Sequence, residues 1–492
     1  MIELDNESSI LILQKIARKA MLERGLIPDF PPEVIREINL ITQPAMERGK
    51  SIIDLRNLLW CSIDNDNSRD LDQLTVAVNT PDGITKMLVA IADVDVLVKK
   101  NSALDIHASH NTTSIYTSVQ IFPMLPEKLS TDFTSLNYNS DRLSMVFEMI
   151  IAQDGSIQSA NIYRALVHNH AKLAYNSVSA WLEGKSFIPE AIKKVKGLDE
   201  NIRQQYGIAQ KLRSFRNSNG ALNFDRKKST PIFEDNKLQF IESEKNTSSK
   251  DMIEDFMIAV NGVSARYLAS KNFPSIRRVV RTPKRWNRIV ELASLQQYDL
   301  PEEPNSKSLD DFLIWSKTND PEHFPDLSLS IIKLLGPGEY VVEVPGDASM
   351  GHFGLAVKDY SHSTAPNRRY PDIITQRLLK SAISGDLTSP YTNQELIAFA
   401  EHCTDAENSS KKVERQVEKS TYILLLESRI GEEFEAIITG LSGKGSWIRL
   451  LNPPVEGKLM SATKGIDVGD KLKVVLVNTD IERGFIDFEE AN

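Results

Sequence analysis

The chain has few cysteines and little glycine or proline for its length. Its 492 residues include 2 cysteines, Cys61 and Cys403, with 23 glycines and 22 prolines. Two cysteines are too few for a disulfide framework or a CxxC metal site, so we interpret both as free thiols of a reducing compartment, the cytoplasm. The hydrophobic share of 41% excludes a disordered or collagen-like chain and suffices for two to four packed domains.

Long hydrophobic runs are also missing. The first 25 residues, MIELDNESSILILQKIARKAMLERG, begin with acidic residues and place apolar residues at helical spacing. This pattern is typical of an amphipathic helix, and it excludes a signal peptide or a membrane span in this stretch. We therefore expect no membrane association.

A global excess of positive charge, the usual footprint of a nucleic-acid binder, is absent, because the formal net charge is −9. One segment departs from this average. Residues 277–288, RRVVRTPKRWNR, hold six cations in twelve positions, with Trp286 among them. A solvated charged face and a local binding patch both remain open for this segment.

The pattern of hydrophobic residues divides the chain into three parts. Residues 1–50 show helical spacing and predict a small N-terminal helical module, with a second helix starting at Pro31–Pro32. Residues 51–420 mix strand and helix patterns and predict a large α+β domain. Residues 430–492 contain five short strand patterns separated by turn residues, which is the size of a five-stranded OB barrel.

The strongest chemical signal is a cluster of carboxylates. In CSIDNDNSRDLDQ, the acids Asp64, Asp66, Asp70 and Asp72 lie within nine residues, between the apolar runs NLLWCSI and LTVAV. Acids forced together repel one another, and hard divalent cations relieve that repulsion. The glycine of an EF-hand loop is missing, which disfavours calcium sensing. A surface turn rich in Asp, Asn and Ser is the alternative for such a cluster.

Two further segments carry candidate site residues. In HSTAPNRRYPDIITQRLLK, Pro371 can open a helix, which places Arg368 and Arg369 beside a helix N-terminus that favours an anion. An ion pair with Asp372 or a distant acid is the alternative role of these arginines. In DMIEDFMIAVNGVSARY, Glu254 and Asn261 align along the edge of an apolar helical face.

Several motifs in order give the chain a resemblance to a known family. SIDNDNSRDLDQLTVAV, VAIADVDVLVKKNSALD, TSIYTSVQIFPMLPEKLSTDFTSLN, LRSFRNSNGALNFDR, DMIEDFMIAVN and GHFGLAVKDYSHSTAPNRRYPDIITQRLL follow one another between about residues 51 and 390. Together they resemble the RNB catalytic domain of the ribonuclease II and ribonuclease R exoribonucleases. The C-terminal segment resembles the S1-type RNA-binding OB domain that follows this catalytic domain in the family.

The resemblance implies a role for each candidate residue. Carboxylates and an amide would hold magnesium, with manganese as the alternative: Asp64, Asp70, Asp72 and Gln73. Catalytic roles fall to Asp72, to Arg368 on the scissile phosphate, and to one of the adjacent acids Glu254 and Asp255, of which we prefer Glu254. RNA contacts fall to Tyr116, Arg369, Asn261 and Trp447. For Tyr116 a core position, and for Trp447 a place inside the barrel, remain open.

The implied function is hydrolytic 3′-to-5′ degradation of single-stranded RNA to nucleoside 5′-monophosphates by two-metal displacement. Two departures from the family are visible: Gln73 stands where many members have a fourth acid, and residues 1–50 stand where cold-shock barrels usually precede the catalytic domain. The alternative is therefore an RNA-binding protein with an inactive RNB domain. A structural cation site in some other hydrolase is a third hypothesis. The sequence is silent on protein partners, oligomeric state and natural substrates.

Overall fold

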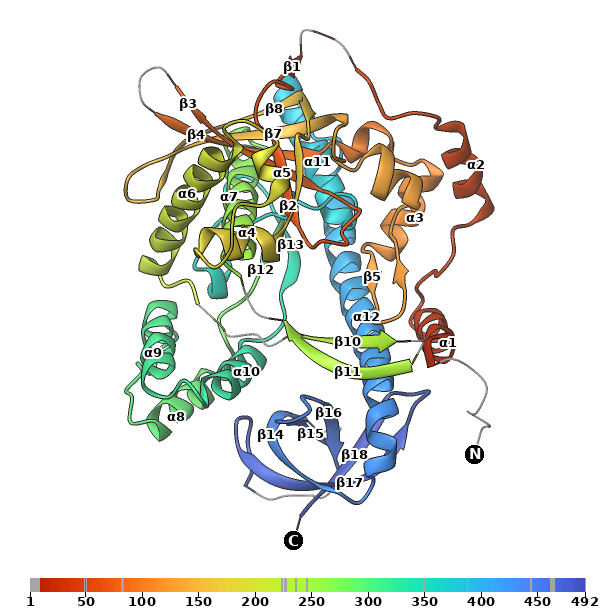
Figure 1. The fold of residues 1–492 in the computed structure, drawn as a ribbon, viewed down its shortest axis with the longest axis vertical. Helices are drawn as coiled ribbons and strands as arrows, with labels where there is room; N and C mark the ends of the chain where they lie inside the picture. The colour runs from red at the N-terminus through yellow and green to blue at the C-terminus, as the bar shows by residue number, and fades with distance from the viewer. Residues whose placement is uncertain are drawn as a thin grey trace.

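The computed structural model describes residues 9–47, 49, 51–80, 84–222, 224, 228–234, 237–244, 247–347, 350–386, 388–442, 445–460 and 465–491, with the backbone alone over 228–244. A mixed sheet with helices packed on it is joined by one long helix to a closed C-terminal barrel (Figure 1). The predicted α+β class with a five-stranded barrel is confirmed.

The large sheet has seven strands and carries the acid cluster at one edge. In spatial order they are β1 (Ile52–Asp54), β8 (Ile157–His168), β7 (Asp141–Ile151), β4 (Thr85–Ala92), β3 (Gln73–Asn79), β2 (Cys61–Asp64) and β9 (Ala171–Ala174). The central pairs are antiparallel, whereas the outermost pairs β1–β8 and β2–β9 are parallel. The acid-rich loop 65–72 thus connects the neighbouring strands β2 and β3.

Four helices pack against the half of the sheet that contains β2 and β3. They are α4 (Tyr175–Leu182), α5 (Glu190–Lys193), α6 (Leu198–Ser218) and α7 (Ser248–Ser270). Asn201 of α6 donates its amide to the Ala77 carbonyl at 2.7 Å and accepts from the Ala77 N–H at 3.1 Å. Because Asn201 is buried, these two bonds fix α6 against β3.

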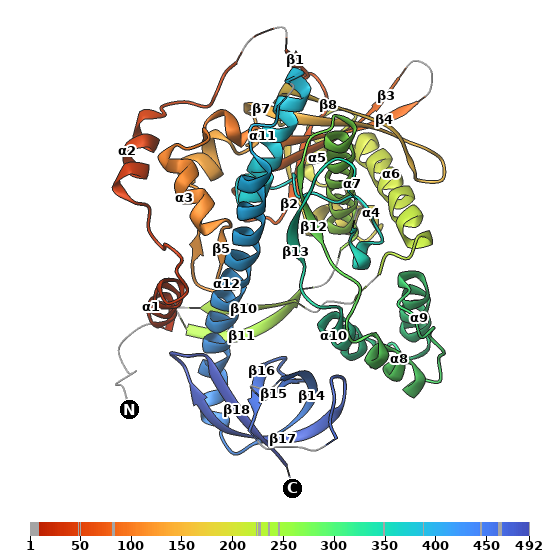
Figure 2. The same cartoon turned by 180° about the vertical axis from the view of Figure 1, so that it is seen from behind.

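The longest helix, α12 (Asn393–Leu426), runs from the sheet to the barrel, as both views show (Figures 1 and 2). It begins with a capping box in which Thr392 and Glu395 satisfy each other's backbone N–H groups. The preceding helix α11 (Tyr370–Ser384) starts at Tyr370, has Pro371 in its first turn and ends at Gly385, whose φ is 79°. Because α12 is one continuous helix from the sheet to the barrel, it fixes the position of the barrel relative to the sheet.

The barrel shares its apolar core with three helices. Its strands, in spatial order, are β14 (Glu433–Ser442), β15 (Gly445–Leu450), β16 (Glu456–Leu459), β18 (Phe485–Glu490) and β17 (Lys471–Asp480). The helices α8 (Trp286–Leu295), α9 (Ser306–Asn319) and α10 (Phe324–Leu335) lie between the strands β12 (Ser275–Val279) and β13 (Glu339–Glu343) in the sequence. One hydrophobic cluster joins these helices, the end of α12 and the barrel interior.

The cations of segment 277–288 form ion pairs that connect the parts of this assembly. Arg278 binds Glu407 of α12 through two bonds of 2.7 and 2.8 Å, and Arg288 binds Asp470 before β17 at 2.7 Å. Arg277, Arg281 and Arg285 pair with Glu343, Glu339 and Asp467, respectively. Arg277, Arg278 and Arg288 are at most 8% exposed. The segment is therefore structural in large part, rather than the solvated face or binding patch that the sequence suggested.

The N-terminal residues form the helices α1 (Ser9–Leu22) and α2 (Pro32–Leu40), as predicted. α1 packs on α12, where Ala17, Ala20 and Met21 meet Val413 and Val417. α3 (Ala103–Asn111) and the short hairpin β5 (Ile115–Tyr116) and β6 (Ile121–Phe122) lie beside α12. No helix within the described residues combines the length and apolar character that crossing a lipid bilayer requires.

Candidate functional site

Asp72 is the buried centre of the acid cluster. Its carbonyl accepts the Ala92 N–H at 3.0 Å, which anchors the residue at the start of β3 beside β4. Its carboxylate accepts the Asn367 N–H at 3.1 Å and lies 3.4 Å from Arg368 Nε. The Asp72 side chain is 5% exposed. The carboxylate of the β2–β3 loop therefore contacts the loop before α11 where it is largely shielded from water.

Burial and like charge shape the electrostatics of this cluster. Burial, together with the charge of Asp70, raises the pKa of Asp72 to about 7, although Arg368 and the Asn367 N–H oppose the shift. Burial and the charge of Asp70 also raise the pKa of Asp64, against hydrogen bonds from the Asn65 N–H and the Ser68 hydroxyl. Asp70 therefore lies close enough to Asp64 and to Asp72 to repel each of them.

Tyr116 and Arg368 lie beside the acids, on segments other than the β2–β3 loop. The Tyr116 hydroxyl donates to Asp70 at 3.1 Å, and the residue is 41% exposed, which excludes a core position. The Ser114 N–H donates to the Arg368 carbonyl at 3.0 Å, so the strand with Tyr116 runs beside the loop with Arg368. The Arg368 side chain is 42% exposed and leaves its guanidinium open to an anion.

Arg369 and Asn261 hold the loop that carries Arg368. Arg369 donates to Asp372 at 2.8 Å, and Asp372 also accepts the Ala365 N–H at 2.8 Å. Asn261, buried on α7, accepts from both the N–H and the hydroxyl of Ser363. The two residues predicted to contact RNA thus make structural contacts behind the cluster.

The adjacent acids on α7 have different surroundings. Asp255 is 2% exposed and pairs with Arg213 and Arg216 of α6. Glu254 is exposed, and its charge acts on Tyr175 together with the charges of Asp64 and Arg368. Asp255 is therefore held in ion pairs with α6, whereas Glu254 remains exposed.

Tyr175 is a site residue that sequence reasoning missed. It is the first residue of α4, directly after β9, and burial with the charges of Asp64 and Glu254 raises its pKa. Tyr175 directly follows β9, which pairs in parallel with β2, so its only signal in the sequence was an aromatic residue at the end of a strand. The pairing joins residues far apart in the chain, such as Cys61 and Ala171, and no local sequence pattern reveals it.

Gln73 and Trp447 complete the predicted set. Gln73 is the first residue of β3 and 9% exposed, so a neutral amide occupies the buried position after Asp72. Trp447 lies on β15 of the barrel, outside the cluster. Trp447 is half-buried. The side chains of Ile448 and Leu450 point to the opposite face of the same strand, are 0% exposed and fill the barrel interior.

The donor set fits a hard divalent cation by its chemistry. Three carboxylates offer oxygen ligands, and a cation would relieve the charge repulsion that adds to burial in raising the pKa values of Asp64 and Asp72. As the side chains stand, no three His, Cys, Asp or Glu groups among the described residues converge closely enough to form a metal site. Asp70 is turned to Tyr116, and Asp64 is bonded to Ser68.

Comparison with known families identifies the parts of the chain. The RNB domain model matches residues 52–385. The chain belongs to the RNB family. The model of the RNase II-type exonuclease C-terminal S1 domain matches residues 432–491, which contain the closed barrel. The RNB match includes Asp64, Asp70, Asp72, Tyr116 and Arg368.

Two curated relatives of this RNB protein carry the name ribonuclease R. It is 28% identical to ribonuclease R of Vibrio parahaemolyticus, over 94% of this chain and 59% of the relative, and 28% identical to ribonuclease R 1 of Lactococcus lactis, over 96% and 60%. The chain thus spans about six tenths of the length of these curated relatives.

Solved structures show the same fold. Mycoplasma genitalium RNase R in complex with ribose methylated single-stranded RNA aligns with a TM-score of 0.85 at 23% identity, covering 99% of this chain and 78% of that one. The structure of yeast Ssd1, a pseudonuclease, aligns with a TM-score of 0.69 at 14% identity, covering 95% and 58%.

Proposed function

We propose that this RNB protein is a magnesium-dependent hydrolytic exoribonuclease that degrades single-stranded RNA from its 3′ end and releases nucleoside 5′-monophosphates. The observation that carries the proposal is the meeting of the buried Asp72 with the half-exposed Arg368, beside Asp64 and Asp70. An anion-binding guanidinium next to a crowded set of carboxylates suits a phosphodiester held by cations.

The chain's own residues divide the work. Asp64, Asp70 and Asp72 would hold magnesium, with manganese as the alternative, and Gln73 adds a neutral oxygen beside them. When bound, divalent ions supply a nucleophilic water at neutral pH and neutralise charge on the phosphate. Arg368 binds the scissile phosphate, and the Asn367 N–H fixes the orientation of the Asp72 carboxylate.

Tyr116 and Glu254 border the reacting phosphate. Tyr116 keeps its hydroxyl on Asp70, and its exposed ring packs against the terminal nucleotide. Glu254 faces the same space from α7, where it orients the strand or accepts a proton from the attacking water. Two buried, unpaired cysteines, Cys61 and Cys403, support placing this reaction in the reducing cytoplasm.

A second candidate is an RNA-binding protein with an inactive RNB domain. Two observations favour it: Gln73 replaces a fourth acid, and the acids do not converge as they stand in the described residues. The buried, repelling carboxylates argue for the active form, because nothing in RNA binding alone requires that destabilising arrangement.

A 3′-end-labelled single-stranded RNA distinguishes the two. With magnesium, the exoribonuclease releases the label at once as a nucleoside 5′-monophosphate, identified by chromatography against the 3′-monophosphate. Release of labelled oligonucleotides would indicate internal cleavage. A label that stays on full-length RNA while the RNA binds would identify the inactive form.

A further inference from the structure

Lys172 reaches from the strand β9 to the loop that carries the acids. Its Nζ donates to the Ser68 carbonyl at 2.7 Å and to the Asp66 carbonyl at 3.4 Å. Its neighbours Ala171 and Leu173 are at most 3% exposed, so alternation along β9 places the Lys172 side chain on the opposite face of the strand. A charged group on a paired strand therefore binds two carbonyls of the β2–β3 loop.

The first half of this loop is an exposed turn that Lys172 ties to the sheet. Residues 65–67 are exposed, so apolar packing does not hold them. The Ser68 N–H donates to the Asn65 carbonyl at 3.1 Å, which closes the turn 65–68. Among the hydrogen bonds of the described residues, only those of Lys172 join this turn to another strand. The position of the turn thus depends on Lys172.

The same turn orients the carboxylate of Asp64. The Ser68 hydroxyl donates to Asp64 Oδ1 at 3.0 Å, and the Asn65 N–H donates to the same oxygen at 2.7 Å. Within the part of the chain that the structure describes, Oδ2 accepts no hydrogen bond, so it is the oxygen that can bind a cation. A chain of contacts therefore runs from Lys172 through Ser68 to Asp64.

The second half of the loop is anchored separately. The Ser135 hydroxyl accepts the Leu71 N–H and donates to the Arg69 carbonyl, both at 2.9 Å. None of these bonds involves Lys172. Loss of Lys172 would therefore release the first half of the loop and leave Asp72 in its place.

We propose that Lys172 is a positioning residue, which holds the turn 65–68 so that Asp64 is oriented to bind a divalent cation together with the other acids. Lys172 acts through the loop backbone and touches neither the cation nor the RNA. Without it, the loop would occupy several positions, and the affinity for the cation would fall with the fraction of molecules in the competent one. This inference rests on the proposed function for the role of the cation.

A purely electrostatic role for Lys172 would have the opposite effect. A positive charge near the acids repels a divalent cation, so removing that charge would strengthen cation binding. If the lysine positions the loop, its removal weakens cation binding. The sign of the change therefore separates the two roles.

The test measures Mn²⁺ binding to the whole protein by electron paramagnetic resonance, without RNA and without turnover. Lys172→Met keeps the aliphatic stem and loses the donors, and it should weaken Mn²⁺ binding about tenfold, as for a competent loop in about one tenth of the molecules. Lys172→Arg should bind Mn²⁺ within about threefold of the wild type, because a guanidinium can also donate to two carbonyls. The Tm of both variants in EDTA should stay within about 2 °C of the wild type, since the position is exposed.

Cleavage of single-stranded RNA supplies a second readout. For Lys172→Met, the magnesium concentration that gives the half-maximal rate should rise about tenfold, whereas kcat should fall less than about threefold, because saturating magnesium selects the competent loop. RNA affinity in EDTA should match the wild type. The control Lys194→Met, at another exposed position, should match the wild type in every measurement.

Mn²⁺ binding by Lys172→Met that equals or exceeds that of the wild type would overturn the proposal. So would an Lys172→Arg variant that binds Mn²⁺ as weakly as Lys172→Met. A loss of Mn²⁺ affinity with a marked fall in Tm would give Lys172 a merely structural role, and weaker RNA binding in EDTA with normal Mn²⁺ binding would make it an RNA contact. Either result would also overturn the proposal.

The positioning role and the proposed function fail separately. Mn²⁺ binding that depends on Lys172 in a protein that cleaves no RNA would refute the exoribonuclease proposal and support the positioning role. RNA cleavage by the wild type, with an Mn²⁺ affinity that does not depend on Lys172, would refute the positioning role alone.

Discussion

Asp72 sits in an unfavourable position for a carboxylate. It is buried next to Asp70, and Arg368 with one backbone N–H compensates only part of the cost, so its pKa rises to about 7. Such costs are tolerated where function requires them. We therefore place the centre of the site at this residue.

Asp72→Asn removes one charge from the site with little change in shape. RNA hydrolysis should fall on the order of a hundredfold or more, because the cations that it helps to hold supply several kcal/mol of charge stabilisation in the transition state. RNA affinity, measured by anisotropy, should stay within about twofold. Asp66→Asn, an exposed acid of the same loop, is the control and should retain activity. Near-normal turnover by Asp72→Asn would remove Asp72 from the mechanism.

The same variant has a stability signature that needs no activity. The folded-state pKa of Asp72 is about 7 against an ordinary value of 3.8, so between these pH values the folded protein binds a proton that the unfolded chain has lost. The contribution of Asp72 to the free energy of unfolding therefore falls as pH rises from about 4 to 7. In EDTA, Asp72→Asn should have a higher Tm than the wild type at pH 8 and a similar Tm at pH 4. A pH-independent difference would contradict the raised pKa.

Gln73→Asp tests whether the neutral amide is a defect. We expect lower activity at every magnesium concentration, because the added charge lies beside Asp72 and raises carboxylate pKa values further. A magnesium titration of both proteins on one RNA decides the matter. A variant several-fold faster at saturating magnesium would favour the inactive-domain hypothesis for the natural sequence.

At this scale the sequence identified residues within local motifs and missed those that act through long-range contacts. Asp64, Asp70 and Asp72 share one loop, and their crowding was visible. Tyr175 reaches the same cluster only because β9 pairs with β2, which no local pattern reveals. Arg369 was assigned to RNA beside Arg368, and the structure pairs it with Asp372, the alternative role that the sequence had left open.

At the scale of elements, the barrel is tied to the RNB domain by a shared core and by Arg288. This arginine, 8% exposed on α8, donates to the Val468 carbonyl at 2.9 Å and to Asp470 at 2.7 Å. Deletion of the barrel would therefore expose apolar surface of α8 and α10 as well as remove the S1-type domain. Point variants separate these effects better than truncation.

Arg288→Met should loosen the barrel. The methionine keeps much of the apolar stem but leaves a carboxylate and a carbonyl without their partner, at a cost of about 2–3 kcal/mol. Thermal unfolding should begin at lower temperature, and proteolysis near residue 431 should become faster. Lys196→Met, at an exposed position, should change neither. Unaltered proteolysis of Arg288→Met would show that the shared core alone holds the barrel.

Elements with strong periodicity were predictable, and their assembly was not. Helical spacing marked α1 and α7, and short strand patterns between turn residues marked the barrel. The ion pairs of Arg277, Arg278 and Arg285 join positions more than fifty residues apart, so the segment resembled a free basic patch. Its cations instead neutralise acids.

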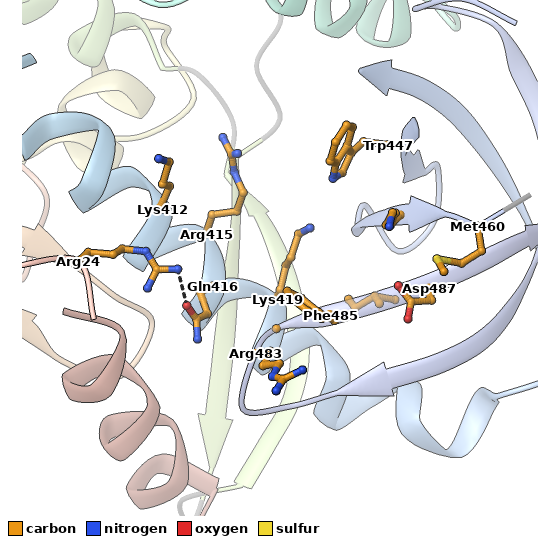
Figure 3. Close-up of a pocket in the computed structure, with 13 residues that line it drawn as sticks. Arg24, Lys412, Arg415, Gln416, Lys419, Trp447, Met460, Arg483, Phe485 and Asp487 are labelled. Atoms are coloured by element: carbon orange, nitrogen blue, oxygen red, sulfur yellow. Dashed lines mark hydrogen bonds between the residues drawn. The ribbon is translucent and has the colours of Figure 1, made fainter. Parts of the chain in front are cut away.

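At the scale of the whole molecule, α12 connects the acid cluster's domain to the barrel. Its Glu414 holds the hairpin of Tyr116, and its cations face the barrel (Figure 3). The account predicts removal of nucleotides one at a time from the 3′ end.

The most direct test is a time course with 5′-end-labelled single-stranded RNA, magnesium and the full chain, resolved to single nucleotides. The account predicts a ladder that shortens from the 3′ end to a short limit product and stops when EDTA is added. RNA that binds the protein but keeps its full length in magnesium and in manganese would contradict it.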